Sequence, residues 1–135
     1  MRAVYLDTSA AVKLFKAEPE SAALEQWLAG YGAALVLTCD LTRCELRRAL
    51  HATGVGPDSY QEAEKWLADC ALIRLTRTLC DRAGSLAPGA ALRSLDALHT
   101  AAALSLGQAL AAFVAYDQRL IDAAKQVGLP VSSPA

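Results

Sequence analysis

The sequence predicts an α/β protein in which a parallel sheet of four or five strands lies between two layers of helices. Its 135 residues suit a single domain, residues 1–135, with one core. Its 29 Ala and 22 Leu residues favour helices. Short apolar runs alternate with helical patterns along the chain, and this alternation is typical of a parallel sheet with crossover helices.

Four short apolar runs predict the strands. They cover residues 3–6, 34–37, 71–75 and 111–115, and residues 130–131 are a candidate for a short fifth strand. The second run, Ala-Leu-Val-Leu, has no charge and no alternation with polar residues. A strand that is covered on both faces has this composition, so we expect helices on both sides of the sheet.

The segments between these runs predict the helices. They cover residues 10–16, 20–28, 40–53, 58–68, 77–87, 95–106 and 118–127. Hydroxyl side chains that suit helix starts precede three of them: Thr8 or Ser9, Thr76, and Ser94. The pair Pro88-Gly89 marks a loop.

Residues 97–116 contain no Asp, Glu, Lys or Arg, and 20 residues is about the length of a membrane span. The run also contains His99, Thr100, Ser105 and Gly107, which suit a lipid core poorly. A helix followed by a buried strand is therefore the better interpretation. We expect no membrane segment.

Charge and cysteine content limit the class of protein. The net charge of −1 excludes a protein that binds nucleic acid through a global positive charge, although a local basic patch stays open. The four cysteines form no C-x-x-C pair and no zinc pattern with histidine. We interpret them as small buried apolar residues in a cytoplasmic protein.

Four carboxylates are expected at one rim of the sheet. Asp7 directly follows the first strand and Asp117 the fourth, while Glu45 and Asp96 lie early in helices. In open parallel sheets, functional residues lie beyond the carboxyl ends of the strands. Each acid alone also has an ordinary explanation as a turn former, a helix cap or a solvated side chain.

Taken together, these acids point to a metal site. Four carboxylates at one rim repel each other, and a hard divalent cation with oxygen ligands, Mg²⁺ or Mn²⁺, removes that repulsion. Such a cation lowers the pKa of bound water and neutralises charge on a phosphate, which supports phosphodiester hydrolysis. His99 lies three residues after Asp96, so it either contacts that acid or only fills space.

Four segments resemble the motifs of one known family, the PIN domain. In order, they are residues 4–10 (VYLDTSA), 41–50 (LTRCELRRAL), 95–103 (LDALHTAAA) and 113–120 (FVAYDQRL). Each motif is weak alone, but the four in this order cover essentially the whole chain. In size and motif style the sequence is most similar to VapC toxins, the ribonuclease halves of bacterial toxin–antitoxin pairs.

The resemblance implies an endoribonuclease that depends on Mg²⁺ or Mn²⁺. It implies that the acids of the four motifs are catalytic and hold the metal: Asp7, Glu45, Asp96 and Asp117. It makes Ser9, or else Thr8, a hydroxyl that supports the site. It also implies a homodimer, an RNA substrate and a VapB-type antitoxin that blocks the site.

Arginines beside Glu45 fit an RNA substrate. Arg43 and Arg48 lie on the same predicted helix, and Arg48 is about 60° from Glu45 around its axis. Arginine binds phosphate through a planar fork, so both are candidates for RNA contacts. An ordinary charged helix face is an equally good explanation.

Other functions stay open at this point. The same scaffold serves RNA-processing nucleases outside toxin–antitoxin pairs. Receiver domains, which accept a phosphoryl group, also gather acids at strand ends, but they need a lysine after a late strand, and Lys125 lies within the last helix. An interaction module without catalysis is a third alternative.

Overall fold

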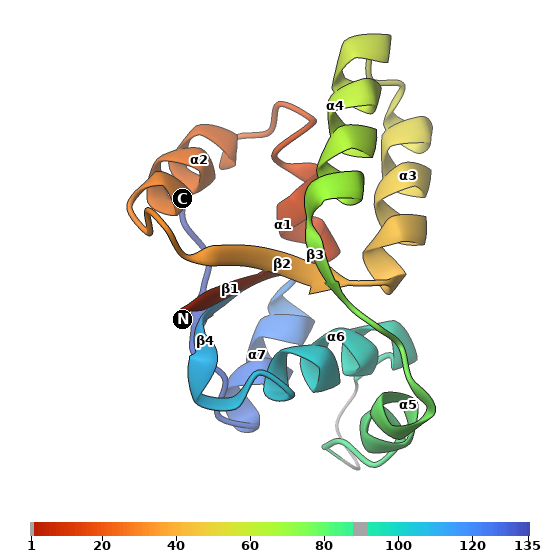
Figure 1. Ribbon diagram of the computed structural model, residues 1–135, viewed down its shortest axis with the longest axis vertical. Helices are drawn as coiled ribbons and strands as arrows, with labels where there is room; N and C mark the ends of the chain where they lie inside the picture. The colour runs from red at the N-terminus through yellow and green to blue at the C-terminus, as the bar shows by residue number, and fades with distance from the viewer. Residues whose placement is uncertain (1, 88–91) are drawn as a thin grey trace.

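A computed structural model describes residues 2–87 and 92–135. Over these residues, five parallel strands form one sheet (Figure 1). The strands are β1 (Ala3–Leu6), β2 (Leu35–Cys39), β3 (Ala71–Ile73), β4 (Leu110–Val114) and β5 (Val131–Ser132). Their order is β3-β2-β1-β4-β5, so β1 lies at the centre. The predicted parallel sheet is confirmed, including its short fifth strand.

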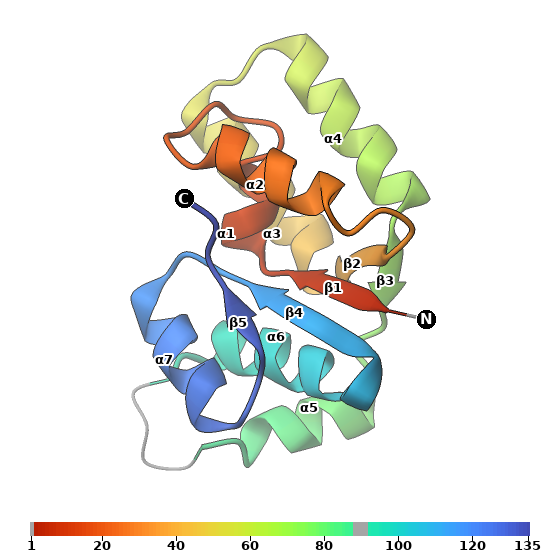
Figure 2. The same ribbon diagram turned by 90° about the vertical axis from the view of Figure 1, so that its left-hand side faces the viewer.

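Helices cover both faces of this sheet, as predicted. They are α1 (Thr8–Val12), α2 (Ser21–Ala29), α3 (Leu41–Thr53), α4 (Pro57–Asp69), α5 (Arg77–Gly84), α6 (Ser94–Leu104) and α7 (Gln118–Gln126), with a 3-10 turn at Gly107–Ala109. Helices α1 to α4 lie on one side, and α5 to α7 lie on the other (Figures 1 and 2). The predicted three-layer arrangement is therefore confirmed.

The central strand β1 is buried on both faces, and all four of its residues are buried. Val4 and Leu6 pack on one face with Leu24 of α2. Tyr5 points to the other face, where its ring stacks on Phe113 of β4 with 5.4 Å between centroids. Successive strand residues point to opposite faces, so this uncharged strand contributes to two cores.

The strand order reverses between β1 and β4. These strands are neighbours in the sheet, although the paired residues Ala3 and Leu110 are 107 positions apart in the sequence. Leu6 pairs with Val114, and the backbone N–H of Asp7 donates to the carbonyl of Val114 at 2.9 Å. In open α/β sheets, ligands bind beyond the carboxyl ends at such a reversal. The edge beyond β1 and β4 is therefore the place to look for a site.

The start of α1 differs from the prediction. The cap is Asp7 rather than Thr8 or Ser9, and its carboxylate accepts the backbone N–H of Ser9 at 3.1 Å. The extended backbone of Asp7 places its side chain beside the free N–H groups of the first turn. The helix ends at Val12, earlier than predicted, and the chain then turns so that Lys13 is buried and pairs with two glutamates.

The starts of α5 and α6 give one confirmed cap and one correction. Thr76 caps α5 and accepts the N–H of Leu79 at 3.1 Å, as predicted. Ser94 is the first residue of α6 rather than its cap, because the extended backbone that precedes the helix belongs to Arg93. The predicted loop at Pro88-Gly89 lies outside the described residues.

The uncharged run from residue 97 to residue 116 forms most of α6 and then β4. Among the helices of the described residues, none is long and apolar enough to cross a membrane.

The cysteines are less uniformly buried than predicted. Cys39, in β2, is fully buried, and Cys70 is half-buried. Cys44 and Cys80 are exposed, because they lie on the outer faces of α3 and α5. The interpretation as buried apolar residues is therefore wrong for these two.

Replacing Phe113 should test the shared core of β1 and β4. Phe113→Ala removes a fully buried ring that stacks on Tyr5, so we expect the free energy of unfolding to fall by about 3–5 kcal/mol in urea titrations. Leu104→Ala is the control, because Leu104 is 36% exposed at the end of α6, and it should cost less than about 1 kcal/mol. Equal losses in both variants would contradict this description of the core.

Candidate active site

The structure brings the four predicted acids to the carboxyl edge of the sheet. Asp7 follows β1 directly and Asp117 follows β4, in each case capping the next helix. Glu45 lies in the second turn of α3, and Asp96 lies in the first turn of α6. Asp7 and Asp96 are buried, whereas Glu45 and Asp117 are half-buried. They form two pairs, and a cationic side chain bridges each pair.

The first pair is Asp7 and Glu45, with His99 between them. The ring Nε2 of His99 lies 2.7 Å from Glu45 Oε1 and 3.5 Å from Asp7 Oδ1. Its Nδ1 lies 2.7 Å from the hydroxyl of Tyr5 and 3.7 Å from Cys39 Sγ. His99 is 1% exposed, so its orientation is fixed by these contacts from β1, β2 and α3.

Two hydroxyls hold this first pair of carboxylates. Ser9 Oγ donates to Asp7 Oδ2 at 2.7 Å and accepts the backbone N–H of Tyr116 at 3.1 Å, so it links α1 to the end of β4. Thr8 Oγ1 donates to Glu45 Oε1 at 2.7 Å. The resemblance implied that Ser9, or else Thr8, supports the site, and in the structure both hydroxyls contact its acids.

Behind Thr8, two buried threonines continue the network. Thr8 Oγ1 lies 2.9 Å from Thr42 Oγ1, which lies 2.8 Å from Thr38 Oγ1. Thr38 and Thr42 are both fully buried. Buried hydroxyls that satisfy one another in this way hold α3 against β2 and fix the direction of Glu45.

Burial and these contacts shift the pKa values of the first pair in opposite directions. Burial raises the pKa of Asp7, and the opposing effects of His99 and Ser9 do not cancel it. Burial also raises the pKa of Glu45, but hydrogen bonds from His99 and Thr8 outweigh it and leave that pKa below its usual value. For His99, burial lowers the pKa, but the hydrogen bonds with Cys39 and Glu45 and the charge of Asp7 raise it to about 10. A charged imidazole thus faces these acids at neutral pH.

The second pair is Asp96 and Asp117, with Arg93 between them. Arg93 Nε donates to Asp96 Oδ2 at 2.9 Å, and its Nη2 donates to Asp117 Oδ2 at 2.6 Å. The other oxygen of Asp117, Oδ1, accepts the backbone N–H of Arg119 at 3.0 Å. In contrast to His99, Arg93 is largely exposed, with 58% of its side-chain surface accessible.

The two pairs belong to one site. Glu45, Arg93 and Asp96 line a single open pocket of about 210 Å³, together with Ser94 and Leu95. The charge of Arg93 also lowers the pKa of Glu45, which places the two pairs within electrostatic reach of each other. The donor set consists of carboxylate and hydroxyl oxygens, which are the ligands that Mg²⁺ and Mn²⁺ prefer.

The carboxylates are arranged around His99 and Arg93 rather than around a common point. In the part of the chain that the structure describes, no three His, Cys, Asp or Glu side chains have the spacing of a metal site. The residues fit a hard cation by their chemistry and their placement at one edge. Binding would require the carboxylates, above all Asp96 and Asp117, to turn from the arginine towards the ion.

Some residues of this site were not predicted from the sequence. His99 faces Glu45 and Asp7, so neither of the two roles that the sequence left open, a contact with Asp96 or space filling, describes it. Tyr5 and Arg93 were not predicted as site residues. Arg93 could have been found from its position, since it precedes Asp96 by three residues at a helix start.

The predicted RNA contacts lie on the outside of α3. Arg43 and Arg48 are exposed there. Their neighbour Arg47 points away to α4, where its Nε and Nη2 donate to the two carboxylate oxygens of Glu64 at 2.7 and 2.9 Å. Arg47 is thereby committed to joining two helices.

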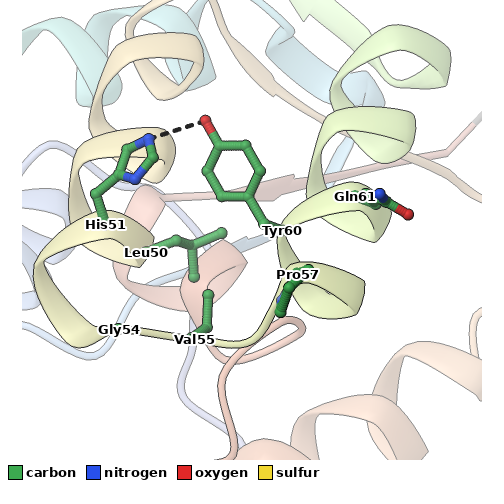
Figure 3. A pocket seen from close by; sticks show the side chains of 7 residues that line it. All are labelled: Leu50, His51, Gly54, Val55, Pro57, Tyr60 and Gln61. Carbon is green, nitrogen blue, oxygen red and sulfur yellow. Dashed lines mark hydrogen bonds between the residues drawn. The ribbon is translucent and has the colours of Figure 1, made fainter.

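A second pocket lies between the end of α3 and the start of α4 (Figure 3). Its lining is Leu50, His51, Gly54, Val55, Pro57, Tyr60 and Gln61. Figure 3 shows His51 and Tyr60 reaching towards each other, with 3.0 Å between Nε2 and the hydroxyl. The lining contains no acid, so this pocket offers no carboxylate chemistry.

Comparison with known proteins identifies the family. Residues 4–126 match the family model described as PIN domain. The chain belongs to the PIN domain family. The strand order observed in this PIN domain also differs from the 2-1-3-4-5 order of receiver domains, which excludes that alternative.

The relatives of this PIN domain are VapC ribonucleases. It is 40% identical to Ribonuclease VapC46 of Mycobacterium tuberculosis strain H37Rv over 135 residues, which is all of both chains. It is 39% identical to Ribonuclease VapC47 of Mycobacterium tuberculosis strain CDC 1551, over 97% of this chain and 96% of that one. The VapC-type ribonuclease predicted from the sequence is thereby confirmed.

Two solved structures share the fold. The crystal structure of Mycobacterium tuberculosis VapC20, described as a toxin that cleaves the sarcin-ricin loop, has a TM-score of 0.77 at 15% identity and covers 97% of this chain and 99% of that chain. FitAcB from Neisseria gonorrhoeae has a TM-score of 0.69 at 17% identity and covers 97% of each chain. At these identities the likeness supports the fold alone.

Removing His99 should show how much the first pair depends on it. His99→Leu takes a hydrogen-bond partner from buried Tyr5 and the counter-charge from Asp7 and Glu45, so we expect a loss of about 2–4 kcal/mol in urea unfolding with EDTA. Adding Tyr5→Phe should recover about 1 kcal/mol, because the orphaned hydroxyl is then gone. Strictly additive losses in the double variant would contradict the contact.

Replacing Asp7 should change stability in a pH-dependent way. Because its folded pKa is raised above the usual 3.8, Asp7 contributes stability that is complete below pH 3.8 and is lost as the pH rises through the raised value. The side chain of Asp7→Asn stays neutral. In EDTA at pH 7 the melting temperature of this variant should therefore be higher than that of the wild type. The difference between the two melting temperatures should shrink towards pH 4.

The control for this measurement is Asp69→Asn, at an exposed position that ends α4. It should show no such pH-dependent gain. A lower melting temperature for Asp7→Asn at pH 7 would mean that the hydrogen bonds of the ionised carboxylate outweigh the effect of burial.

Proposed function

We propose that this PIN domain, acting as one unit over residues 1–135, is the endoribonuclease toxin of a toxin–antitoxin pair. We further propose that it hydrolyses RNA phosphodiester bonds with Mg²⁺ or Mn²⁺ held by Asp7, Glu45, Asp96 and Asp117. One observation carries the proposal: four carboxylates from β1, α3, α6 and the end of β4 converge on one edge of the sheet.

In this mechanism the residues of the chain have distinct tasks. A bound divalent cation supplies a water of lowered pKa and neutralises charge on the scissile phosphate. Asp7 and Asp96, which are buried at the edge of the sheet, would hold the cation against which the phosphate binds. Ser9 keeps Asp7 Oδ2 engaged, while Asp7 Oδ1 lies 3.5 Å from Nε2 of His99. Thr8 and His99 hold Glu45 in place.

His99 limits the charge that the site must tolerate. Its contacts with Asp7 and Glu45 neutralise part of the repulsion among the carboxylates. Because it is buried and held on both ring nitrogens, it stays in place while ions and substrate exchange in front of it. We infer that it orients Glu45 and does not contact RNA.

The partners follow from the family and from charge. We expect RNA to contact Arg43 and Arg48, which are exposed on the helix that carries Glu45. A VapB-type antitoxin would block the same edge of the sheet, and the toxin would act as a homodimer in the cytoplasm. The full-length similarity to VapC46 and VapC47 supports this assignment.

RNA cleavage with and without metal tests the proposal. Wild-type protein should cleave RNA with Mg²⁺ or Mn²⁺ and should stop when EDTA is added. Asp7→Asn and Asp96→Asn should each lose about a hundredfold or more in cleavage rate, since each removes a charged ligand from the site. Gel analysis of labelled RNA measures both effects.

Asp69→Asn is the matched control, because it removes one carboxylate at an exposed position outside the site and should cleave at the wild-type rate. Cleavage that survives both EDTA and Asp7→Asn would overturn the metal–carboxylate mechanism. Loss of cleavage in the control would point to a general charge effect.

A further inference from the structure

Arg93 has an unusual position for an exposed side chain. It stands immediately before α6 and bridges two acids that are 21 residues apart in the sequence. Over residues 2–87 and 92–135, it is the single Lys or Arg side chain that forms an ion pair with Asp96 or Asp117.

We propose that Arg93 is a movable cation of the active site, which neutralises Asp96 and Asp117 until a divalent cation binds and then contacts a phosphate of the RNA. This inference rests on the proposed function, because it takes the carboxylates as metal ligands and RNA as the substrate. It assigns to Arg93 both a competition with the metal and a contact with the substrate.

The competition follows from the oxygen atoms involved. Arg93 contacts Oδ2 of Asp96 and Oδ2 of Asp117. Oδ1 of Asp117 already accepts the backbone N–H of Arg119, so Oδ2 is the oxygen of this residue that becomes free when Arg93 leaves. Arg93 and a divalent cation therefore compete for the same two carboxylates, and binding of one weakens binding of the other.

Exposure makes the displacement of Arg93 easy. Ion pairs at the surface are weak because solvent screens them, and 58% of the Arg93 side chain is accessible. A divalent cation binds two carboxylates more strongly than a solvated guanidinium does. Arg93 can therefore leave, whereas His99 cannot, because His99 is buried and held on both nitrogens.

Once displaced, Arg93 is well placed to bind a phosphate. It lines the same open pocket as Glu45 and Asp96, so a phosphate bound at those acids would lie beside its side chain. A guanidinium has five N–H donors in a planar fork that matches the oxygens of a phosphate. The charge of Arg93 would then stabilise the phosphate rather than the acids.

The test compares Arg93→Ala, Arg93→Lys and a matched control, Arg77→Ala, which removes an exposed arginine from α5. The first readout is Mn²⁺ binding without RNA, measured by calorimetry and by the electron paramagnetic resonance signal of free Mn²⁺. Arg93→Ala should bind Mn²⁺ about two- to tenfold more tightly than the wild type, because its competitor is gone. The control should bind Mn²⁺ as the wild type does.

The second readout is single-turnover RNA cleavage at saturating Mn²⁺. Here Arg93→Ala should be slower by about tenfold or more, because the phosphate has lost a charged donor. Arg93→Lys keeps the charge but not the planar fork, so its cleavage rate should lie between that of the wild type and that of Arg93→Ala. Tighter metal binding together with slower chemistry is the signature of the proposal, since a merely structural role would weaken both.

Two results would overturn the proposal. Weaker Mn²⁺ binding by Arg93→Ala would mean that Arg93 supports the ligands instead of competing for them, and an unchanged cleavage rate would mean that it does not contact the substrate. If the wild-type protein binds Mn²⁺ but cleaves no RNA, the proposed function fails, whereas the binding comparison still decides the competition. Thermal unfolding confirms that each variant is folded.

Discussion

The site depends on one costly arrangement, a carboxylate buried at the end of the central strand. Asp7 is 5% exposed and follows four fully covered residues of β1, where an isolated ionised acid would be strongly unfavourable. Three parts of the fold make it tolerable. Ser9 supplies two donors from α1, His99 supplies a positive charge from α6, and β4 pairs with its backbone. Helices on both faces are thus tied to the same carboxylate.

This arrangement explains why the active edge lies at the reversal of strand order. Asp7 ends β1 and Asp117 follows β4, so two neighbouring strands deliver acids to one edge. Ser9 joins these two ends directly, since its hydroxyl bonds both Asp7 and the N–H of Tyr116. A change in the packing of β1 against β4 would therefore move the acids relative to each other.

The sequence predicts most of the fold and the acids of the site, but not the contacts among them. Uncharged runs such as β1 must be covered on both faces, and acids that follow such strands must share an edge. The contact of His99 with Tyr5 joins residues 94 apart, and no local pattern encodes it. The cap of α1 was misassigned for a related reason, because Asp7 serves the helix and the site with the same carboxylate.

The two cations of the site differ in a way that fits their positions. His99 is almost fully buried between Asp7 and Glu45, so it gives a positive charge at neutral pH where solvent screens the repulsion between these acids less. Arg93 is exposed beside Asp117, which is half-buried, and solvent already weakens that repulsion. A fixed charge therefore suits the first pair, Asp7 and Glu45, and a replaceable charge suits the second pair, Asp96 and Asp117. The net charge of −1 therefore conceals an acidic edge whose repulsion is balanced locally by a histidine and an arginine.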